Sequence, residues 1–398
     1  MKIKNFSFLI LVFSFILQLC LGSHYSWSVF AQELHSHYGF TMVQCQTVYA
    51  SFHLLFTFTL ILGGKLLDKF DPRMIAFTGS LIYSIAYILS GLTNPSFWKI
   101  LLFIGFFGGI GVGLVYMIPI SISQKWFPKI KSIVTGIAVA GFGLGAFFIS
   151  IISELMLKKN ITLKNIFLLY GIIFLFFTSI SSLFLKKPES EESKEKEIKK
   201  LFNNRSDYSF FYMLYFAMFT GLFTGLMIAS NLKPLAITKG LYSLNATLGV
   251  SLFAIFNGSG RIIWGMITQK INEYNTIVLS LLFQFSILIA GLFIIHSTTG
   301  YLLFSAIVGF NYSATLTIYA STVSTVWGFN KFNRIYPLLF TSNGIAGLTA
   351  PVFAGWIFDT FSTYTPAIIF AALLCFCAGF SFLLFTKKGI NYNKGDLK

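Results

Sequence analysis

Long apolar runs of about 20 residues recur along the whole chain, separated by short polar segments. Inside a bilayer every backbone polar group needs a partner within the protein, which an α-helix provides within one segment. About 20 helical residues cross the hydrocarbon layer, and a chain that is 56% hydrophobic and 11% charged has too much apolar surface for a soluble protein. We therefore predict an all-α integral membrane protein. The twelve expected spans are residues 6–30, 47–67, 74–92, 98–123, 132–157, 165–185, 208–231, 245–269, 274–296, 300–323, 333–357 and 364–386.

The first run follows Lys2 and Lys4 and also fits the apolar part of a cleaved signal peptide. Cleavage would leave eleven spans and would remove part of an apparent internal repeat. We therefore interpret this run as the first spanning helix.

The net charge of +16 is distributed unevenly between the two sides of the predicted membrane. With both termini cytoplasmic, the inner segments and adjoining span ends carry 22 Lys and Arg, and the outer ones carry six. This is the positive-inside pattern, which sets the orientation of membrane proteins. We expect the lipid bilayer, and not nucleic acid, to be the partner of this charge. The host membrane is a plasma or bacterial inner membrane, with an organelle membrane as the open alternative.

A polar, highly charged segment divides the twelve spans into two sets of six. We predict a first bundle at residues 1–187, a cytoplasmic linker at 188–206 and a second bundle at 207–398. "GKLLDKF" (64–70) and "GMITQKI" (265–271) occupy the same place in each half. Parallel repeats of six helices with a site between them are a transporter architecture.

The loop "GGKLLDKFDPR" (63–73) resembles the loop signature of the major facilitator superfamily, and "GMITQKI" resembles its weaker second copy. The resemblance implies two pseudo-symmetric six-helix bundles and a loop motif that takes part in conformational change. Its residues here would be Gly64, Asp68, Lys69, Arg73, Gly265 and Lys270.

Three further stretches resemble the oxalate:formate antiporter family and its relatives, the monocarboxylate transporters. They are "GSHYSWSVF" (22–30), "GGIGVGLVYMIPISISQKWFPKIKSIVTGIAVAGFGLGA" (108–146) and "FNGSGRIIWG" (256–265). The resemblance implies transport of small organic anions by alternating access. The glycines of the long stretch let neighbouring helices approach closely and slide, as a rocking transporter needs, and they also fit ordinary tight helix packing.

Arg261 is the only arginine in the interior of a predicted span, since Arg334 lies at the very start of the span 333–357. A charge at mid-membrane costs about 2.5–3.5 kcal/mol on insertion scales. Asp68 and Asp71 lie in a loop and Glu154 lies near an outer helix end, so Arg261 has no evident internal counter-ion. Because its planar fork suits a carboxylate, we predict that Arg261 binds an anionic substrate. The alternative is an arginine that snorkels or bonds to backbone carbonyls.

Residues three and four apart share a helix face, so Asn257, Arg261, Trp264 and Thr268 form a polar and aromatic stripe. This stripe fits a water-lined cavity better than a lipid-facing surface. We include Asn257 and Trp264 in the predicted substrate site.

The resemblance also implies that His24, Tyr25 and Tyr116 line the site, with Tyr312 as a further candidate. A tyrosine hydroxyl can donate to a carboxylate while its ring excludes water. The alternative for each residue is an aromatic side chain packed in a phenylalanine-rich protein.

Two positions depart from the family pattern. The oxalate transporters have a second cation, a lysine, where this chain has Asn343, so a dianion would be left with one unbalanced charge. Monocarboxylate transporters place an aspartate, which takes part in proton coupling, where this chain has Asn257. We therefore expect a monocarboxylate such as pyruvate, lactate or formate. Any proton coupling would have to use His24 or His53, although His53 also fits a neutral, packed side chain.

Other functions place different demands on the sequence. An enzyme would need facing carboxylates, a metal cluster or a Ser–His pair within the spans. We find none, the cysteines lack metal or redox spacing, and we expect no metal, no cofactor and a monomer. A channel is disfavoured by the repeat, and an oxalate/formate exchanger or a transport-inactive sensor on the same fold remain alternatives.

Overall fold

The computed structural model describes residues 2–67, 69–127, 131–188 and 205–387, and the regular structure of these residues is helical throughout. In chain order the elements are α1 (Lys2–Leu21), the 3-10 helix η1 (Gly22–Ser26), α2 (Trp27–Tyr38), α3 (Met42–Leu67), α4 (Pro72–Leu92), α5 (Phe97–Ile100), the π-helix η2 (Leu101–Gly108), α6 (Gly109–Val115), α7 (Met117–Trp126), α8 (Lys131–Lys158), α9 (Leu163–Phe184), α10 (Arg205–Thr238), α11 (Ser243–Ile271), α12 (Glu273–Ile294), α13 (Thr298–Trp327), α14 (Phe329–Phe361) and α15 (Thr365–Lys387).

Twelve helical segments of the described chain are long and apolar enough to cross a membrane, so the predicted all-α class and span number are confirmed. The first segment combines α1, η1 and α2, and the fourth combines α5, η2, α6 and α7. Two segments extend furthest past their predicted ends: the first continues to Tyr38 and the seventh to Thr238. The polar residues at these ends made them resemble loops in the sequence, but helix packing covers much of their surface.

Local signals explain where several helices begin and end. Asp71 precedes α4, its carboxylate accepts a hydrogen bond from the Arg73 backbone N–H at 2.9 Å, and Pro72 fills the first helical position. Ser297 caps α13 in the same way through the Gly300 N–H. Gly39 ends α2 with a φ of 71°, a left-handed conformation that glycine adopts without steric cost.

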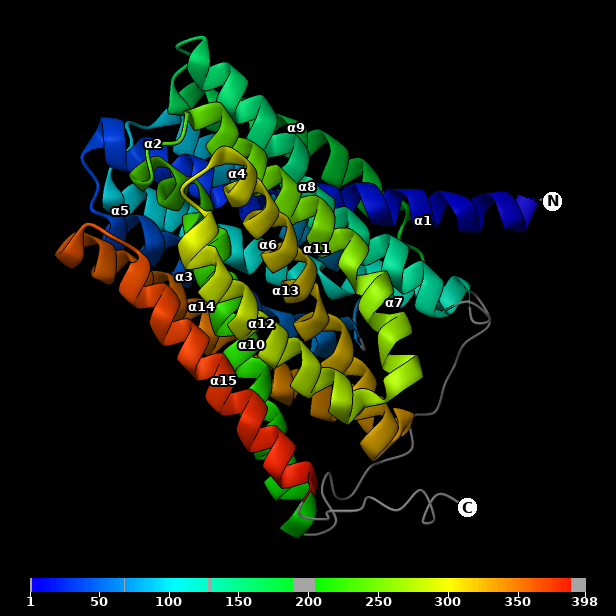
Figure 1. Ribbon diagram of the computed structural model, residues 1–398. Helices are drawn as coiled ribbons and strands as arrows, with labels where there is room; N and C mark the ends of the chain where they lie inside the picture. Colours follow the sequence, from blue (N-terminus) through cyan, green and yellow to red (C-terminus); the bar gives the residue numbers. More distant parts are fainter. Residues whose placement is uncertain (1, 68, 128–130, 189–204, 388–398) are drawn as a thin grey trace.

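The chain has a first half, α1 to α9, and a second half, α10 to α15. Within each half the helices pack mainly against other helices of the same half. In the first half α4 packs against α9 and α3 against α6; in the second half α11 packs against α13 and α12 against α15. The largest contacts between the halves are those of α3 against α14 and α8 against α11, and α2 also packs against α10. Figure 1 shows the start of α1 at the right and the ends of α10 and α15 at the bottom, so these ends of the two halves lie apart in this view.

The contact between α8 and α11 depends on small residues. A Cβ atom at Gly143 of α8 would lie 3.2 Å from the Gly258 Cα of α11, so side chains there would push the helices apart. The glycine-rich stretch predicted to allow close approach does so at this point.

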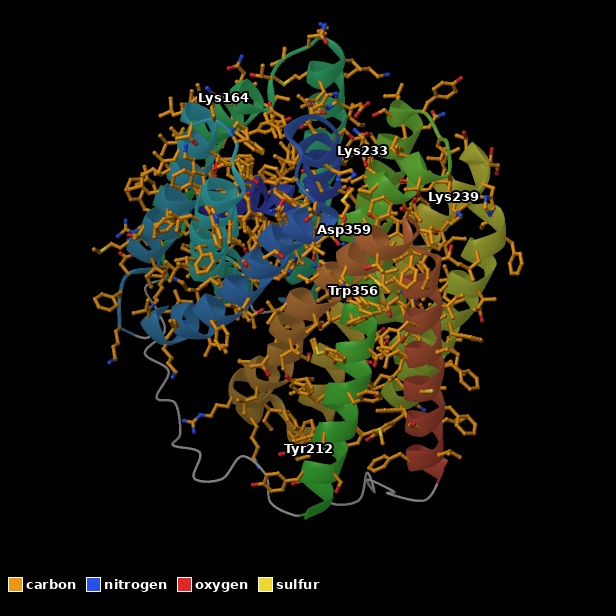
Figure 2. All side chains as sticks on the ribbon, turned by 90° about the vertical axis from the view of Figure 1, so that its left-hand side faces the viewer. Lys164, Tyr212, Lys233, Lys239, Trp356 and Asp359 are labelled. Carbon is orange, nitrogen blue, oxygen red and sulfur yellow. The ribbon has the colours of Figure 1, made fainter. Side chains whose placement is uncertain are left out.

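Hydrogen bonds join the halves at one end of the molecule. Figure 2 places Lys164 and Lys233 toward one end and Tyr212 toward the other. At the end that contains Lys233, hereafter the Lys233 end, the Asp359 carboxylate at the end of α14 accepts from the first two backbone N–H groups of α3, at 3.0 and 2.8 Å. This carboxylate of the second half thus caps a helix of the first half.

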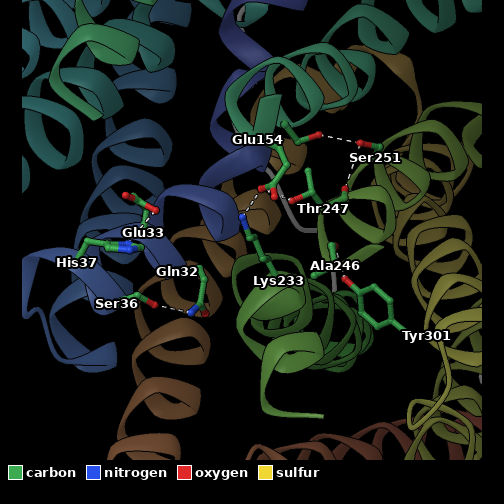
Figure 3. Close-up of polar contacts among 11 residues, drawn as sticks. Gln32, Glu33, Ser36, His37, Glu154, Lys233, Ala246, Thr247, Ser251 and Tyr301 are labelled. Atoms are coloured by element: carbon green, nitrogen blue, oxygen red, sulfur yellow. Dashed lines mark hydrogen bonds and ion pairs between the residues drawn. The ribbon is translucent and has the colours of Figure 1, made fainter. Parts of the chain in front are cut away.

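A buried ion pair forms a second link at the Lys233 end. Lys233 of α10 donates to Glu154 of α8 at 2.5 Å, and the Thr247 hydroxyl of α11 donates to the same carboxylate oxygen at 2.9 Å (Figure 3). The Lys233 and Glu154 side chains are 4% and 2% exposed. Glu154 lies close to the end of α8 at Lys158, as predicted for a residue near a helix end, and there it binds a lysine of the other half.

Candidate binding site between the two halves

Arg261 lies near the middle of α11, where α11 packs against α8 of the first half. The side chain is 9% exposed, and its Nε and Nη2 atoms are buried with no hydrogen-bond partner among the described residues. Buried N–H donors normally have partners, so two unpaired donors on a charged group make Arg261 a candidate for binding an anionic group.

Four tyrosines are close enough to interact electrostatically with the Arg261 guanidinium. They are Tyr25, Tyr116, Tyr312 and Tyr336. Tyr25 belongs to the first half and Tyr312 to the second, and their hydroxyl oxygens are 3.4 Å apart. The structure therefore brings the predicted residues Tyr25, Tyr116 and Tyr312 together around the predicted arginine.

Phenylalanine rings support this tyrosine group. The Phe142 ring of α8 contacts the rings of Tyr25 and Tyr116, with centroids 5.7 and 4.8 Å away. Phe56 of α3 packs edge-on against Tyr116 at 5.2 Å. Tyr116 itself lies between α6 and α7, and its carbonyl accepts a hydrogen bond from the Gln18 side chain. These contacts hold the hydroxyls in an apolar surrounding, where an anion interacts more strongly with them than in water.

His24 lies directly beside Tyr25, with ring centroids 4.2 Å apart. It is 5% exposed, and its Nε2 atom has no partner among the described residues. A small cavity with room for about one water molecule lies beside it, lined by Trp27, Phe30 and Tyr49 among others. This cavity lies within the first half and does not border Arg261, so it is not the binding site that the arginine indicates.

The stripe predicted on α11 is buried, but its members differ in their contacts. Asn257 is fully buried one turn before Arg261, and neither polar atom of its amide has a partner among the described residues. The Trp264 indole N–H donates to the Phe310 carbonyl of α13, and the Thr268 hydroxyl donates to the Trp264 carbonyl. Asn257 therefore joins Arg261 as a group with free hydrogen-bonding capacity, whereas Trp264 ties α11 to α13.

Asn343 is buried on α14, where its amide donates to the Thr57 hydroxyl of α3 at 3.1 Å. The residue thus connects the two halves close to the site. Its side chain carries no charge, so Arg261 has no cationic neighbour at this position.

The predicted loop motif lies away from Arg261 and the tyrosines near it. Gly64 is on α3, Lys69 is exposed in the following turn, and Arg73 binds the Asp71 carboxylate at 2.7 Å. This bond and the nearby positive charge hold the pKa of the Asp71 carboxyl below its usual value. The second copy, Gly265 and Lys270, lies near the end of α11. Asp68 lies outside the described residues.

The sequence did not lead us to predict Tyr336 as a site residue, although its position in the sequence contained a usable signal. Tyr336 lies two helical turns before Asn343 on α14, so both residues face the same direction. The sequence offers many aromatic residues, however, and only the fold shows that this one lies near the Arg261 charge.

Comparison with known proteins identifies the architecture. Residues 7–350 match the model of the Major Facilitator Superfamily. The chain belongs to this superfamily. Its fold is similar to that of a bacterial homologue of the human lysosomal transporter Spinster in an inward-facing, unoccupied conformation, with a TM-score of 0.76 and 16% identity over 96% of this chain and 97% of the other.

Two relatives within the superfamily agree with the resemblance noted in the sequence. The chain is 25% identical to the oxalate:formate antiporter of Oxalobacter formigenes, over 91% of this chain and 88% of the relative. It is 20% identical to monocarboxylate transporter 12 of Mus musculus, over 86% of this chain and 77% of the relative. The protein is therefore a multi-pass membrane transporter of the major facilitator type, with relatives named for carboxylates.

Proposed function

We propose that this transporter carries small monocarboxylate anions by alternating access, and that Arg261 binds the carboxylate. The observation that carries the proposal is the buried guanidinium with two unpartnered donors, near enough to four tyrosines to interact with them electrostatically. An arginine that served only to tie helices together would bond to carbonyls. These two donors have no such partner among the described residues.

The geometry suits a bound carboxylate. The Nε and Nη2 atoms of a guanidinium lie on one edge and can donate two parallel hydrogen bonds to one carboxylate. Tyr25 and Tyr312 approach from opposite halves of the chain, so an anion between them would contact both halves at once. Binding in this position links the occupancy of the site to the contact between the halves, as alternating access requires.

The charge balance favours a monoanion. Asn343 is neutral and its amide is engaged with Thr57, so a dianion would meet one guanidinium and no second cation at that position. Exchange of oxalate for formate, the activity for which the bacterial relative is named, remains the alternative function for this site.

The charge distribution supports an orientation with both termini cytoplasmic, which places the Lys233 end on the outer side. In this orientation Glu154, Lys233 and Asp359 close the outer side of a two-bundle carrier, with bundles at 1–187 and 207–398. A membrane-impermeant thiol reagent should fail to label a cysteine placed in the 188–206 linker of intact cells. Labelling there from outside would contradict the orientation.

Uptake into proteoliposomes tests the function. We expect saturable uptake of labelled pyruvate or lactate that is accelerated by unlabelled substrate on the opposite side, with weak competition by oxalate. Linear uptake without counterflow would indicate a channel, binding without uptake would indicate a sensor, and preference for oxalate over all monocarboxylates would indicate the alternative exchanger.

A further inference from the structure

A buried lysine places its positive charge between the two halves at the Lys233 end. The Lys233 side chain of α10 is 4% exposed and binds Glu154 of α8, which also accepts a hydrogen bond from Thr247 of α11 (Figure 3). Glu33 of α2, a further carboxylate within electrostatic reach of Lys233, is itself bound to His37 at 3.2 Å. Among the described residues, Lys233 thus donates to one carboxylate, and this carboxylate belongs to the other half.

A row of small and polar residues leads from this lysine toward Arg261. The row is the contact between α8 and α11, whose residues meet in antiparallel order: Glu154 with Thr247, Ser150 with Ser251 at 2.8 Å between the hydroxyl oxygens, and Gly143 with Gly258. Gly258 lies about one turn before Arg261, and Thr247 and Arg261 are about 20 Å apart along α11 at 1.5 Å per residue. The row therefore extends from the Lys233 end to the candidate binding site.

Alternating access requires this row to open. The two helices belong to different halves, and a substrate reaches a site between the halves only when the halves part on one side. Parting at the Lys233 end separates Lys233 of the second half from Glu154 of the first. The Ser150 and Ser251 hydroxyls, which bond to each other in the closed form, would then line the entrance.

The separated lysine would lose its counter-ion. An opposite charge within about 4–6 Å stabilises a buried cation, and Lys158, which interacts electrostatically with Lys233, adds a second positive charge nearby. A carboxylate of the substrate has the same chemistry as the Glu154 side chain. It can therefore take the place of Glu154 without changing the net charge beside the lysine, so Glu154 and the substrate would compete for one cation.

We propose that Lys233 is an outer binding site for the transported anion, and that Glu154 occupies this site whenever the outer side is closed. An arriving carboxylate displaces Glu154 and holds the halves apart. When the anion moves on to Arg261, Glu154 returns to Lys233 and the outer side closes. The inference rests on the proposed function for the class of anion, and it adds a second, separate binding site.

Cysteine labelling in a carrier without the central site tests this inference. Ser251→Cys, in a background without native cysteines and with Arg261→Gln, places a thiol at the contact that opens. Pyruvate at constant ionic strength should increase the rate of labelling severalfold and saturably, because a ligand that binds only the open form shifts the population toward it. Lys233→Met, alone or together with Glu154→Gln, should abolish this response. Acetamide, which is uncharged, should produce none.

Uptake measures the same site in carriers that keep Arg261. Glu154→Gln and Glu154→Gln/Lys233→Met both lack the ion pair, but only the first retains the cation. The external pyruvate concentration that gives half-maximal uptake should therefore be about tenfold higher in the double variant, the effect of one charge-assisted hydrogen bond. Lys164→Gln provides the control, because Lys164 lies toward the same end and is bonded to Asn94. This variant should keep the wild-type value.

The outcomes separate this inference from the proposed function. A labelling rate that pyruvate leaves unchanged in the Arg261→Gln carrier would show that Lys233 serves only as the partner of Glu154. A response that persists in Lys233→Met would also overturn the inference. If Arg261→Gln does not fold, equal half-saturating concentrations in Glu154→Gln and the double variant overturn it instead. Absence of any monocarboxylate uptake by the wild-type carrier would reject the proposed function, whereas a pyruvate response that depends on Lys233 would still show the outer site.

Discussion

In the proposed function, Asn343 is the residue that would most directly limit the charge of the substrate. It lies beside the site as a neutral amide, bonded to Thr57. Asn343→Lys should bring a second cation close to the anion and raise the affinity for oxalate relative to pyruvate by about tenfold, the effect of about 1.4 kcal/mol. Competition of both anions for labelled pyruvate uptake measures the ratio. Asn343→Gln keeps the amide and serves as the control; a similar rise in that variant would show that charge is not the cause.

Asn257 tests whether the α11 stripe can respond to protons. Its amide is fully buried and unpaired one turn from Arg261. In Asn257→Asp an ionised carboxylate would compete with the substrate for the guanidinium, and its protonation would release the guanidinium. Substrate affinity of the variant should therefore rise as the pH falls, more steeply than in wild type. Identical pH profiles for wild type and variant would show that residue 257 does not act on Arg261.

The buried ion pair between Glu154 and Lys233 joins α8 to α10. Removing it tests whether these two helices hold the halves together at the Lys233 end. Glu154→Gln leaves Lys233 buried without its charged partner, and removal of one member of a buried pair typically costs about 3–5 kcal/mol. The variant should unfold at a lower temperature in detergent and should expose the Lys233 end more often. A cysteine at Ser251, in a background without native cysteines, should then react faster with a thiol reagent.

The double variant Glu154→Gln/Lys233→Met provides the control for this pair. It removes both charges, so it should regain stability relative to Glu154→Gln alone. Suppose that Glu154→Gln and Lys233→Met alone each lower the unfolding temperature only slightly, and that their effects add in the double variant. Glu154 and Lys233 then do not hold the halves together.

The helices themselves could be predicted because their signals are local. Twelve apolar runs of spanning length and one isolated charge are visible without any knowledge of the fold. The pairing of Glu154 with Lys233 could not be predicted, because 79 residues separate them and each resembles a residue at a helix end. Tyr336 was missed for a similar reason: its chemistry is common in this chain, and only packing places it near Arg261.

At the scale of the whole molecule, the proposed function places the binding site and the contacts that change during transport at the same interface. Tyr25 and Tyr312, Thr57 and Asn343, and His53 and Gly347 all meet across the two halves. An anion at Arg261 would add a further contact at this interface. The central claim is therefore that Arg261 is retained for the substrate and not for the fold.

Substrate affinity per folded molecule in Arg261 variants tests this claim most directly. Arg261→Lys keeps the charge but cannot form two parallel bonds, so binding should weaken about 10- to 100-fold, the value of one charge-assisted hydrogen bond of about 1.5–3 kcal/mol. Arg261→Gln should lose binding and yet insert and fold at least as well as wild type, because it removes an unpaired buried charge. Normal affinity in Arg261→Lys, or an Arg261→Gln protein that fails only by misfolding, would show that the arginine is structural.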